Sequence, residues 1–135
     1  MDIDPNIVER VVPVRRNGRT YRAFYIKALD PDPGRHCKGL DPALMFAPEA
    51  EDYESVSELR LATYAAHRYA SELCQGCPMI EHCAEWGIAH EEYGVWGGLP
   101  PAMRKRTRMK RGQIFAPIAY ETPQQRQHDT LEVGA

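Results

Sequence analysis

Apolar residues recur at helical spacing along one segment near the middle of the chain. They are Leu59, Ala62, Ala66, Tyr69 or Ala70, and Leu73. Because residues three or four apart share one face of an α-helix, this pattern predicts a helix from about residue 56 to residue 73. Ser55 and Glu58 fit the capping box that begins such a helix, and Cys74 would lie at its C-terminal end.

Glycine and proline mark the boundaries of shorter elements after this helix. Residues 75–76, Gln-Gly, can form the turn that brings Cys77 back beside Cys74. Pro78 suits the first position of a second helix, which would carry Cys83 and run toward residue 92. The sequence therefore predicts two helices joined by a tight turn, with cysteines on both sides of it.

A glycine-rich segment, GVWGGLPP, follows at residues 94–101. Its glycines permit positive φ, so a tight turn can hold the indole of Trp96 in a defined position, packed inward or presented to a partner. The prolines at 100 and 101 then begin a last helix, and the tail over residues 116–135 is predicted to be disordered.

Near the N-terminus, β-prone residues flank an Asn17-Gly18 pair. Over residues 12–26 this arrangement predicts a hairpin with a type I′ turn, and Pro13 restricts its first strand to a sheet edge. Because an isolated two-stranded ribbon is marginally stable, we expect this Arg-rich arm to be disordered or to order only on a partner. We assign it no activity.

A compact apolar group lies between the arm and the central helix. Asp41-Pro42 offers an N-cap followed by proline, so a short helical turn is expected over Leu44, Met45 and Phe46, which we expect to join the core. The predicted fold is mostly α, with about four short helices. Its parts are an N-terminal arm (1–35), a central domain (36–99), a basic helix (100–115) and the tail (116–135).

Charge is distributed unevenly along the 135 residues, although the net charge is only −2. Residues 41–92 hold eleven acidic side chains against two basic ones, whereas residues 104–111 hold six basic side chains and no acidic one. The six are Arg104, Lys105, Arg106, Arg108, Lys110 and Arg111. Such a segment is suited to phosphate backbones, although a solvated helix end has the same composition.

The sequence begins without a basic region followed by a long apolar run, and no stretch approaches the ~18 apolar residues that span a membrane. We therefore expect a soluble, cytoplasmic protein. Because the cytosol keeps thiols reduced, the four cysteines point to metal binding or redox chemistry rather than to structural disulfides.

The four cysteines, Cys37, Cys74, Cys77 and Cys83, have the spacing C-x36-C-x2-C-x5-C. Thiolates bind both zinc and iron-sulfur clusters, and composition does not separate the two. Zinc ribbons usually show two C-x2-C pairs, whereas this chain has one, which favours a cluster. Two histidines that adjoin cysteines, at positions 36 and 82, are interpreted as surface or supporting residues because four thiolates complete the usual set.

The segment Cys74-Gln75-Gly76-Cys77 also has the form of a redox motif. A thiol at a helix N-terminus has a lowered pKa and attacks disulfides, and Cys77 comes just before Pro78. However, the surrounding pattern is helix, turn, helix, whereas thioredoxin-like motifs lie in a βαβ unit. On the residues alone, the cluster, zinc and redox interpretations all stay open.

Several motifs together resemble the WhiB-like family of actinobacteria and their phages. They are Cys37, DPALMF (41–46), CQGC (74–77), Cys83 and GVWGG (94–98), followed by the basic segment. They occur in the family's order over residues 37–111, and C-x2-C-x5-C followed by GVWGG is highly specific. The resemblance implies a transcription regulator and not an enzyme, with a [4Fe-4S] cluster, that binds region 4 of the primary sigma factor of RNA polymerase.

The resemblance also implies roles for individual residues. The four cysteines would be the cluster ligands, and clusters in the family respond to nitric oxide or oxygen. The sigma contacts would be Met45, Phe46, Gly94, Val95, Trp96, Gly97 and Gly98. The six basic side chains of residues 104–111 would meet promoter DNA, and neither a membrane nor a small-molecule substrate is expected.

Three features depart from the family's pattern. The interval between Cys37 and Cys74 is longer than usual, which we assign to the acidic loop EAEDYES (49–55). Met45 stands where the family often has a second aromatic residue, which would weaken or retune the sigma contact. KRGQ at 110–113 is not the RGRP of an AT-hook, so the basic segment predicts phosphate contacts rather than sequence readout.

Two functions from other classes remain as alternatives. A protein disulfide reductase would use Cys74 and Cys77 in the metal-free form, where these cysteines can form a disulfide. A zinc-stabilised module would bind DNA without the sigma factor.

Overall fold

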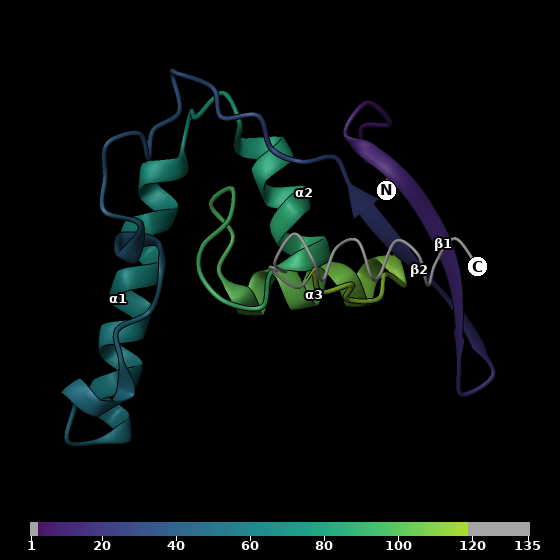
Figure 1. Ribbon diagram of the computed structural model, residues 1–135. Coiled ribbons are helices and arrows are strands. Elements are labelled where there is room, and N and C mark those ends of the chain that lie inside the picture. Colours follow the sequence, from purple (N-terminus) through teal and green to yellow (C-terminus); the bar gives the residue numbers. More distant parts are fainter. Residues whose placement is uncertain (1–2, 119–135) are drawn as a thin grey trace, which may run out of the picture.

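The computed structural model describes residues 3–118 and contains three α-helices, one β-hairpin and two 3-10 helices in that part of the chain. The elements are β1 (Val8–Arg16), β2 (Arg19–Ile26), η1 (Pro42–Met45), η2 (Ala50–Asp52), α1 (Val56–Cys74), α2 (Ile80–His90) and α3 (Pro101–Arg111). Figure 1 shows α1 at one end, the hairpin at the other, and α2 and α3 between them. Most of the predicted tail, from residue 119 on, lies outside the described residues.

The N-terminal hairpin has the predicted turn. Its strands pair antiparallel, with Arg16 opposite Arg19 beside the turn. Asn17 and Gly18 have φ of 51° and 75°, the left-handed conformation that a type I′ turn requires at both central residues. The local signal in the sequence therefore located the turn correctly.

The hairpin is held on the rest of the fold because β2 packs on α2. Phe24 and Ile26 are buried against Ala89. The N–H of Ile26 donates to Nε2 of His90 at 3.1 Å, and Nδ1 of His90 lies 2.7 Å from the carbonyl oxygen of Ala116. A neutral imidazole makes both bonds, accepting at Nε2 and donating at Nδ1. The arm was expected to be disordered or to order only on a partner, whereas the structure orders it on α2. The contacts that order it join residues far apart in the sequence, so a local pattern does not reveal them.

Helix α1 agrees with the prediction at both ends. The hydroxyl of Ser55 accepts the N–H of Glu58 at 3.1 Å as the N-cap, and Cys74 is the last helical residue. Ala70 is the one buried residue of α1, so the helix presents most of its surface to solvent. Neither α1 nor any other helix within residues 3–118 is long and apolar enough to cross a membrane.

The short helix η1 has the predicted cap but not the predicted burial. The Asp41 carboxylate accepts the N–H of Ala43 at 3.0 Å. Leu44 and Phe46 are 39% and 43% exposed, so the expectation that they join the core is wrong. Helix η1 packs against α1 at the edge of the molecule, and none of its residues is fully buried.

Helix α2 is shorter than predicted at both ends. It begins at Ile80, with Met79 as its N-cap, so Pro78 lies in the preceding turn. It ends at His90, where the following backbone becomes extended. Cys83 is on this helix, as predicted, whereas Cys77 precedes it.

Helix α3 is joined to the hairpin through the residues that come directly after it. The N–H of Arg22 donates to the carbonyl oxygen of Gly112 at 3.0 Å, and the N–H of Ile114 donates to the carbonyl oxygen of Arg22 at 2.9 Å. Residues 112–114 therefore lie alongside β2, with an isolated parallel bridge between Arg22 and Gln113. These bonds fix the hairpin relative to the C-terminal end of α3.

Candidate metal centre and contact surface

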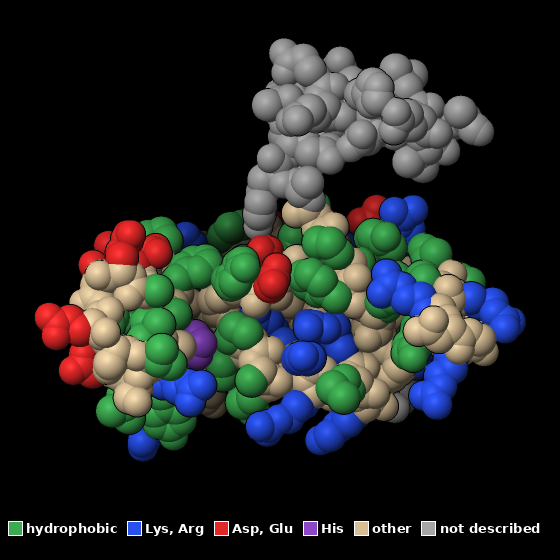
Figure 2. Space-filling model, turned by 90° about the horizontal axis from the view of Figure 1, so that it is seen from below, with side chains coloured by type: hydrophobic (Ala, Val, Ile, Leu, Met, Phe, Trp, Pro, Cys, Tyr) green, Lys and Arg blue, Asp and Glu red, His purple; other side chains and the backbone are tan. Residues whose placement is uncertain are grey.

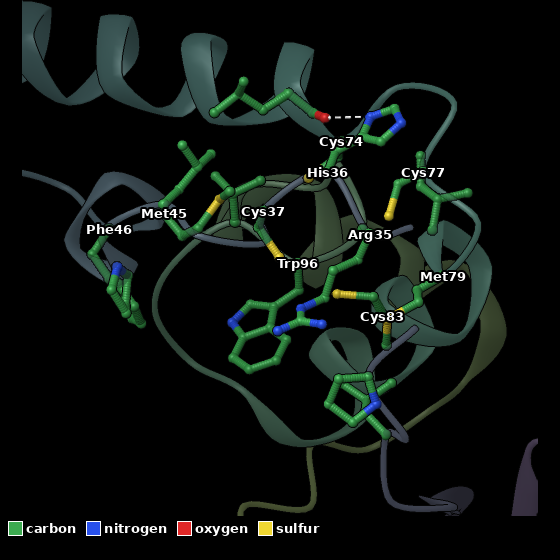
Figure 3. A pocket seen from close by; sticks show the side chains of 18 of the residues that line it. Arg35, His36, Cys37, Met45, Phe46, Cys74, Cys77, Met79, Cys83 and Trp96 are labelled. Atoms are coloured by element: carbon green, nitrogen blue, oxygen red, sulfur yellow. Dashed lines mark hydrogen bonds between the residues drawn. The ribbon is translucent and has the colours of Figure 1, made fainter. Parts of the chain in front are cut away.

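The four cysteines line one cavity of about 730 Å³. Cys37 comes from the loop after the hairpin, Cys74 from the last turn of α1, Cys77 from the following turn and Cys83 from α2. Figure 3 shows their side chains around the same space. Cys37 is exposed and the other three are half-buried. The structure thus brings together residues that are up to 46 positions apart in the sequence.

Two histidine rings tie the segments around the cavity together. Nδ1 of His36 lies 2.9 Å from the carbonyl oxygen of Leu73, which holds the loop of Cys37 against the end of α1. Nε2 of His82 lies 2.8 Å from the carbonyl oxygen of Lys27, which holds α2 against the chain after the hairpin. Both histidines therefore have backbone partners that support the site.

The turn between α1 and α2 places Cys77 beside Cys74. Gly76 has φ of 77°, a conformation that residues with a side chain rarely adopt. The N–H of Cys77 donates to the carbonyl oxygen of Cys74 at 3.1 Å and closes the turn. Cys83 lies on the first turn of α2, where its N–H donates to the carbonyl oxygen of Met79 at 2.8 Å.

Two of the thiols are hydrogen-bonded to the glycine-rich turn. Burial raises the pKa of Cys83 to about 11 and also raises the pKa of Cys74. The backbone N–H of Gly97 bonds to Cys83 and that of Gly98 bonds to Cys74, and each bond lowers the pKa of its thiol by favouring the thiolate. Because metal coordination requires thiolates, these N–H groups would stabilise sulfur ligands and tie the turn to the sulfur site.

The site is compatible with an iron-sulfur cluster. Four thiolates are a usual ligand set for such clusters. The cavity of about 730 Å³ is far larger than the ~30 Å³ share of one water, so it has room for a group of several atoms. Within residues 3–118, no three side chains of His, Cys, Asp or Glu lie close enough together to hold a single metal ion.

The disulfide reductase alternative requires an activated thiol in the C-x-x-C pair. Burial raises the pKa of Cys74, which is the opposite of the shift that makes a thiol nucleophilic at neutral pH. Helix α2 begins at Ile80, so Cys77 is not at its N-terminus as the sequence suggested. Neither feature supports a catalytic thiol.

Close packing of glycines on α2 positions Trp96. Gly97 has φ of 57°, and a Cβ at this position would overlap the backbone of α2 at Ala84. A Cβ on Gly87 would overlap the Cβ of Trp96, so this glycine inside α2 makes room for the tryptophan. Nε1 of Trp96 donates to the carbonyl oxygen of Tyr93 at 3.0 Å. Gly87 was not identified from the sequence, although an isolated glycine in a helical pattern is a signal of close packing.

The residues at the end of η1 lie against the glycine-rich turn. The N–H of Val95 donates to the carbonyl oxygen of Met45 at 2.7 Å, and the ring of Phe46 lies over Gly94. Phe46 is 43% exposed and Tyr93 is 69% exposed. The two distant segments of the predicted sigma contact therefore lie together, beside Tyr93, which the sequence did not single out. Three predicted contacts, Gly94, Val95 and Gly97, are buried, so the exposed part of this surface comes from their neighbours.

Arg104 is fully buried, although it was predicted to contact DNA. Its two terminal nitrogens donate four hydrogen bonds of 2.5 to 3.2 Å. The acceptors are the carbonyl oxygens of Glu91, Tyr93, Gly94 and Leu99. Burial, with a smaller effect of Arg108, lowers the pKa of Arg104 to about 10, so the guanidinium stays charged at neutral pH. Arg104 thus fixes both sides of the glycine-rich turn to α3 and does not face solvent.

Two more of the six basic residues also have partners within the fold. Nη1 of Arg108 donates to the carbonyl oxygen of Ile88 at 2.9 Å. Arg111 donates twice to the buried carboxylate of Glu85, at 2.6 and 3.2 Å. With Arg104 these arginines are spaced i, i+4 and i+7, which is one face of a helix. The exposed members of the predicted DNA contact are Lys105, Arg106 and Lys110.

Arg35 is a further residue of the cavity that the sequence did not single out. It lines the same space as the cysteines, and Figure 3 shows its guanidinium directed toward the interior. Nη1 of Arg35 donates to the carbonyl oxygen of Asp32 at 3.1 Å. A cation in this position would favour thiolates. Its place two residues before Cys37, in a turn-rich linker, carries no periodic signal that could have indicated this role.

Comparison with known proteins agrees with the sequence motifs. A family model described as transcription factor WhiB matches residues 34–109. The chain is 48% identical over 48 residues to the transcriptional regulator WhiB2 of Mycolicibacterium smegmatis. It is 32% identical over 77 residues to the redox-responsive transcriptional regulator WhiB3 of the same species, and 41% identical over 64 residues to the transcriptional regulator WhiD of Streptomyces coelicolor.

The matches differ in the lengths that they cover. They span 35% of this chain and 36% of WhiB2, 56% of this chain and 72% of WhiB3, and 47% of this chain and 51% of WhiD. The family match begins at residue 34, after the hairpin. The cysteines, the glycine-rich turn and most of α3 lie inside the matched region, and the hairpin lies outside it.

Proposed function

Because the chain belongs to the WhiB family of transcription factors, we propose that it is a transcriptional regulator that holds a [4Fe-4S] cluster on Cys37, Cys74, Cys77 and Cys83. It binds region 4 of the primary sigma factor of RNA polymerase through the surface formed by η1 and the glycine-rich turn. It meets promoter DNA through α3 and acts in the cytoplasm, without enzymatic activity. The named relatives, which are transcriptional regulators, support this class of function.

The observation that carries the proposal is the double attachment of residues 94–98. On one side, the N–H groups of Gly97 and Gly98 bond to two of the cysteines. On the other side, the same segment forms a surface with Phe46 and positions Trp96. A change at the sulfurs would therefore alter the surface offered to the sigma factor.

The bound cluster would supply thiolate-ligated iron that reacts with nitric oxide or oxygen. The residues of the chain would determine how such a reaction changes the protein. Cys37 is exposed, and its loop depends on the bond between His36 and the end of α1. Release of the sulfur ligands would leave that loop and the glycine-rich turn with fewer restraints, so the sigma surface would lose order. WhiB3 is described as redox-responsive, and for this chain a redox response is part of the proposal.

The DNA half of the proposal rests on the exposed face of α3. Lys105, Arg106 and Lys110 can neutralise phosphates, which would position the protein on a promoter without reading its sequence. Arg104 holds the sigma surface on the same helix. The two contacts would therefore keep a fixed relative position.

Anaerobic co-expression with sigma region 4 tests the proposal. We expect a brown complex with broad absorption near ~400 nm, typical of thiolate-ligated iron-sulfur centres. Cys37→Ser should abolish both colour and complex formation. Trp96→Ala should retain the colour and lose most of the complex. Tyr64→Ala, at an aromatic residue of α1 that is 66% exposed, is the matched control and should retain both.

Three results would each overturn part of the proposal. Colourless protein with stoichiometric zinc would refute the cluster, and brown protein that never binds region 4 would refute the sigma contact. If Trp96→Ala and Tyr64→Ala bind the sigma factor equally well, the glycine-rich turn is not the contact surface.

A further inference from the structure

The hairpin carries arginines for which the proposed function has no use. Residues 10–22 contain five arginines and no acidic residue. They are Arg10, Arg15, Arg16, Arg19 and Arg22, and all five are exposed. The family match begins only at residue 34, so the function of this segment has to be argued from its own chemistry.

Two of the five arginines lie against aromatic rings of the protein. The guanidinium of Arg10 stacks on the ring of Tyr25 at 4.2 Å. Arg22 lies 5.3 Å from the centre of the Phe24 ring and donates to the carbonyl oxygen of Arg111 at 3.5 Å. The remaining three arginines are exposed at the turn end of the hairpin, where Arg15 donates to the carbonyl oxygen of Gly18 at 3.5 Å.

The turn end of the hairpin concentrates positive charge without compensation. Arg16 and Arg19 are directly opposite each other across the strands, and Arg15 is adjacent. Like charges in this arrangement destabilise a hairpin. Within residues 3–118 the ion pairs are Arg68 with Glu72 and Arg111 with Glu85, so none involves the turn end. An anionic ligand would relieve this repulsion.

The turn end and the exposed bases of α3 are parts of one surface. The backbone bonds of Arg22 to residues 112 and 114 fix β2 beside the end of α3, and Arg19 is three residues along the same strand. In Figure 1 the hairpin passes the C-terminal end of α3, and its turn lies beyond that end at the lower right. Figure 2, viewed from that side, shows basic side chains over α3 and the hairpin, whereas acidic side chains gather at the opposite end of this face.

We propose that Arg15, Arg16 and Arg19 bind the phosphate backbone of double-stranded DNA as a second contact, beside the contact made by α3. This inference rests on the proposed DNA-binding function and extends it to a segment outside the family match. A two-stranded ribbon has a width suited to the ~12 Å major groove of DNA, where its turn meets phosphates on both sides. Val11 is the one strongly exposed large apolar side chain of the hairpin, so a protein partner would find no apolar centre there.

The test is the salt dependence of binding by the full-length, cluster-loaded protein to a double-stranded DNA of ~30 base pairs, long enough for about three helical turns. The hairpin variant is Arg16→Gln with Arg19→Gln. Loss of two phosphate contacts should reduce the slope of log K against log salt by about 2 and weaken binding by up to about 60-fold at 0.1 M salt. The matched control is Arg60→Gln with Arg68→Gln, which removes two exposed arginines from α1 and should leave both quantities unchanged.

Three results would overturn the inference. They are equal slopes for the hairpin variant and the control, wild-type binding that does not depend on salt, and stronger binding to single-stranded RNA or an acidic peptide than to the DNA. Because the variant removes repulsion between arginines, its melting temperature should be equal to or above that of the wild type, which excludes misfolding as the cause of weaker binding.

A sigma pull-down on the same preparations separates this inference from the proposed function. If DNA binding depends on the hairpin while sigma binding is absent, the hairpin contact stands and the sigma contact fails. If sigma binding is normal in both variants and the slopes are equal, the hairpin contact fails alone.

Discussion

Replacement of the buried Arg104 by alanine should strongly destabilise the protein. Its four hydrogen bonds come from a charged donor, and bonds of this type contribute about 1.5–3 kcal/mol each when fully buried. The bond to Gly94 is buried and the other three are partly buried, so we count one at ~2 kcal/mol and three at ~1 kcal/mol each. Water that reaches the freed carbonyl oxygens in the variant offsets part of this sum, which leaves a net loss of about 3–4 kcal/mol.

Urea unfolding of the loaded protein, followed by circular dichroism under anaerobic conditions, measures this loss. With a slope of ~1.5 kcal/mol per molar urea, the midpoint for Arg104→Ala should fall by about 2 M. Arg104→Lys should lose about half as much, because an ammonium has three donors and cannot span all four carbonyls. Arg106→Ala, at an exposed position of the same helix, should stay within ~0.5 kcal/mol of the wild type. If Arg104→Ala matched Arg106→Ala, the buried arginine would not hold the turn.

Two further substitutions test local features of the fold. Gly97→Ala should unfold the glycine-rich turn, because its Cβ would overlap the backbone at Ala84. Gly112 has a similar positive φ but open space around it, so Gly112→Ala should lower the free energy of unfolding by only ~1–2 kcal/mol. Similar losses in thermal melts would contradict the packing argument. Burial lowers the pKa of His90, so below pH ~6.5 only the unfolded chain takes up its proton. The contribution of His90 to the free energy of unfolding should therefore be complete above that pH and be lost as the pH falls. Between pH ~7.5 and ~5.5, the free energy of unfolding of His90→Gln should fall less than that of the wild type. Equal decreases in the two proteins would refute this assignment.

Elements with local signals could be predicted from the sequence. The Ser55 cap and the apolar spacing defined α1, and the Asn17-Gly18 pair defined the hairpin turn. Both depend on residues within a few positions of each other, so a short stretch of sequence includes all the residues that interact. The four cysteines, which the sequence grouped by residue type, line one cavity, and their role as cluster ligands stays a prediction.

Features that depend on distant partners could not be predicted in this way. His90 holds the hairpin through Ile26, 64 residues earlier in the chain, and no periodicity reports such a bond. The basic segment was misleading for another reason. A count of charges does not say which way each side chain points. Three of the four arginines of α3, spaced three or four residues apart, face inward to carbonyl or carboxylate oxygens. Helical periodicity, applied to arginines rather than to apolar residues, would have separated Arg104 from Lys105.

The separation of acidic and basic side chains gives the molecule an electric dipole. The net charge of −2 should repel it weakly from nucleic acid, yet its two ends differ in sign. The electric field of a polyanion would orient such a molecule before contact. The hairpin and α3 would then face the polyanion, and the acidic end near η2 would face away from it. This orientation shortens the search for a productive encounter. If the protein binds DNA as proposed, the acidic end would stay exposed to solvent on the side away from the DNA.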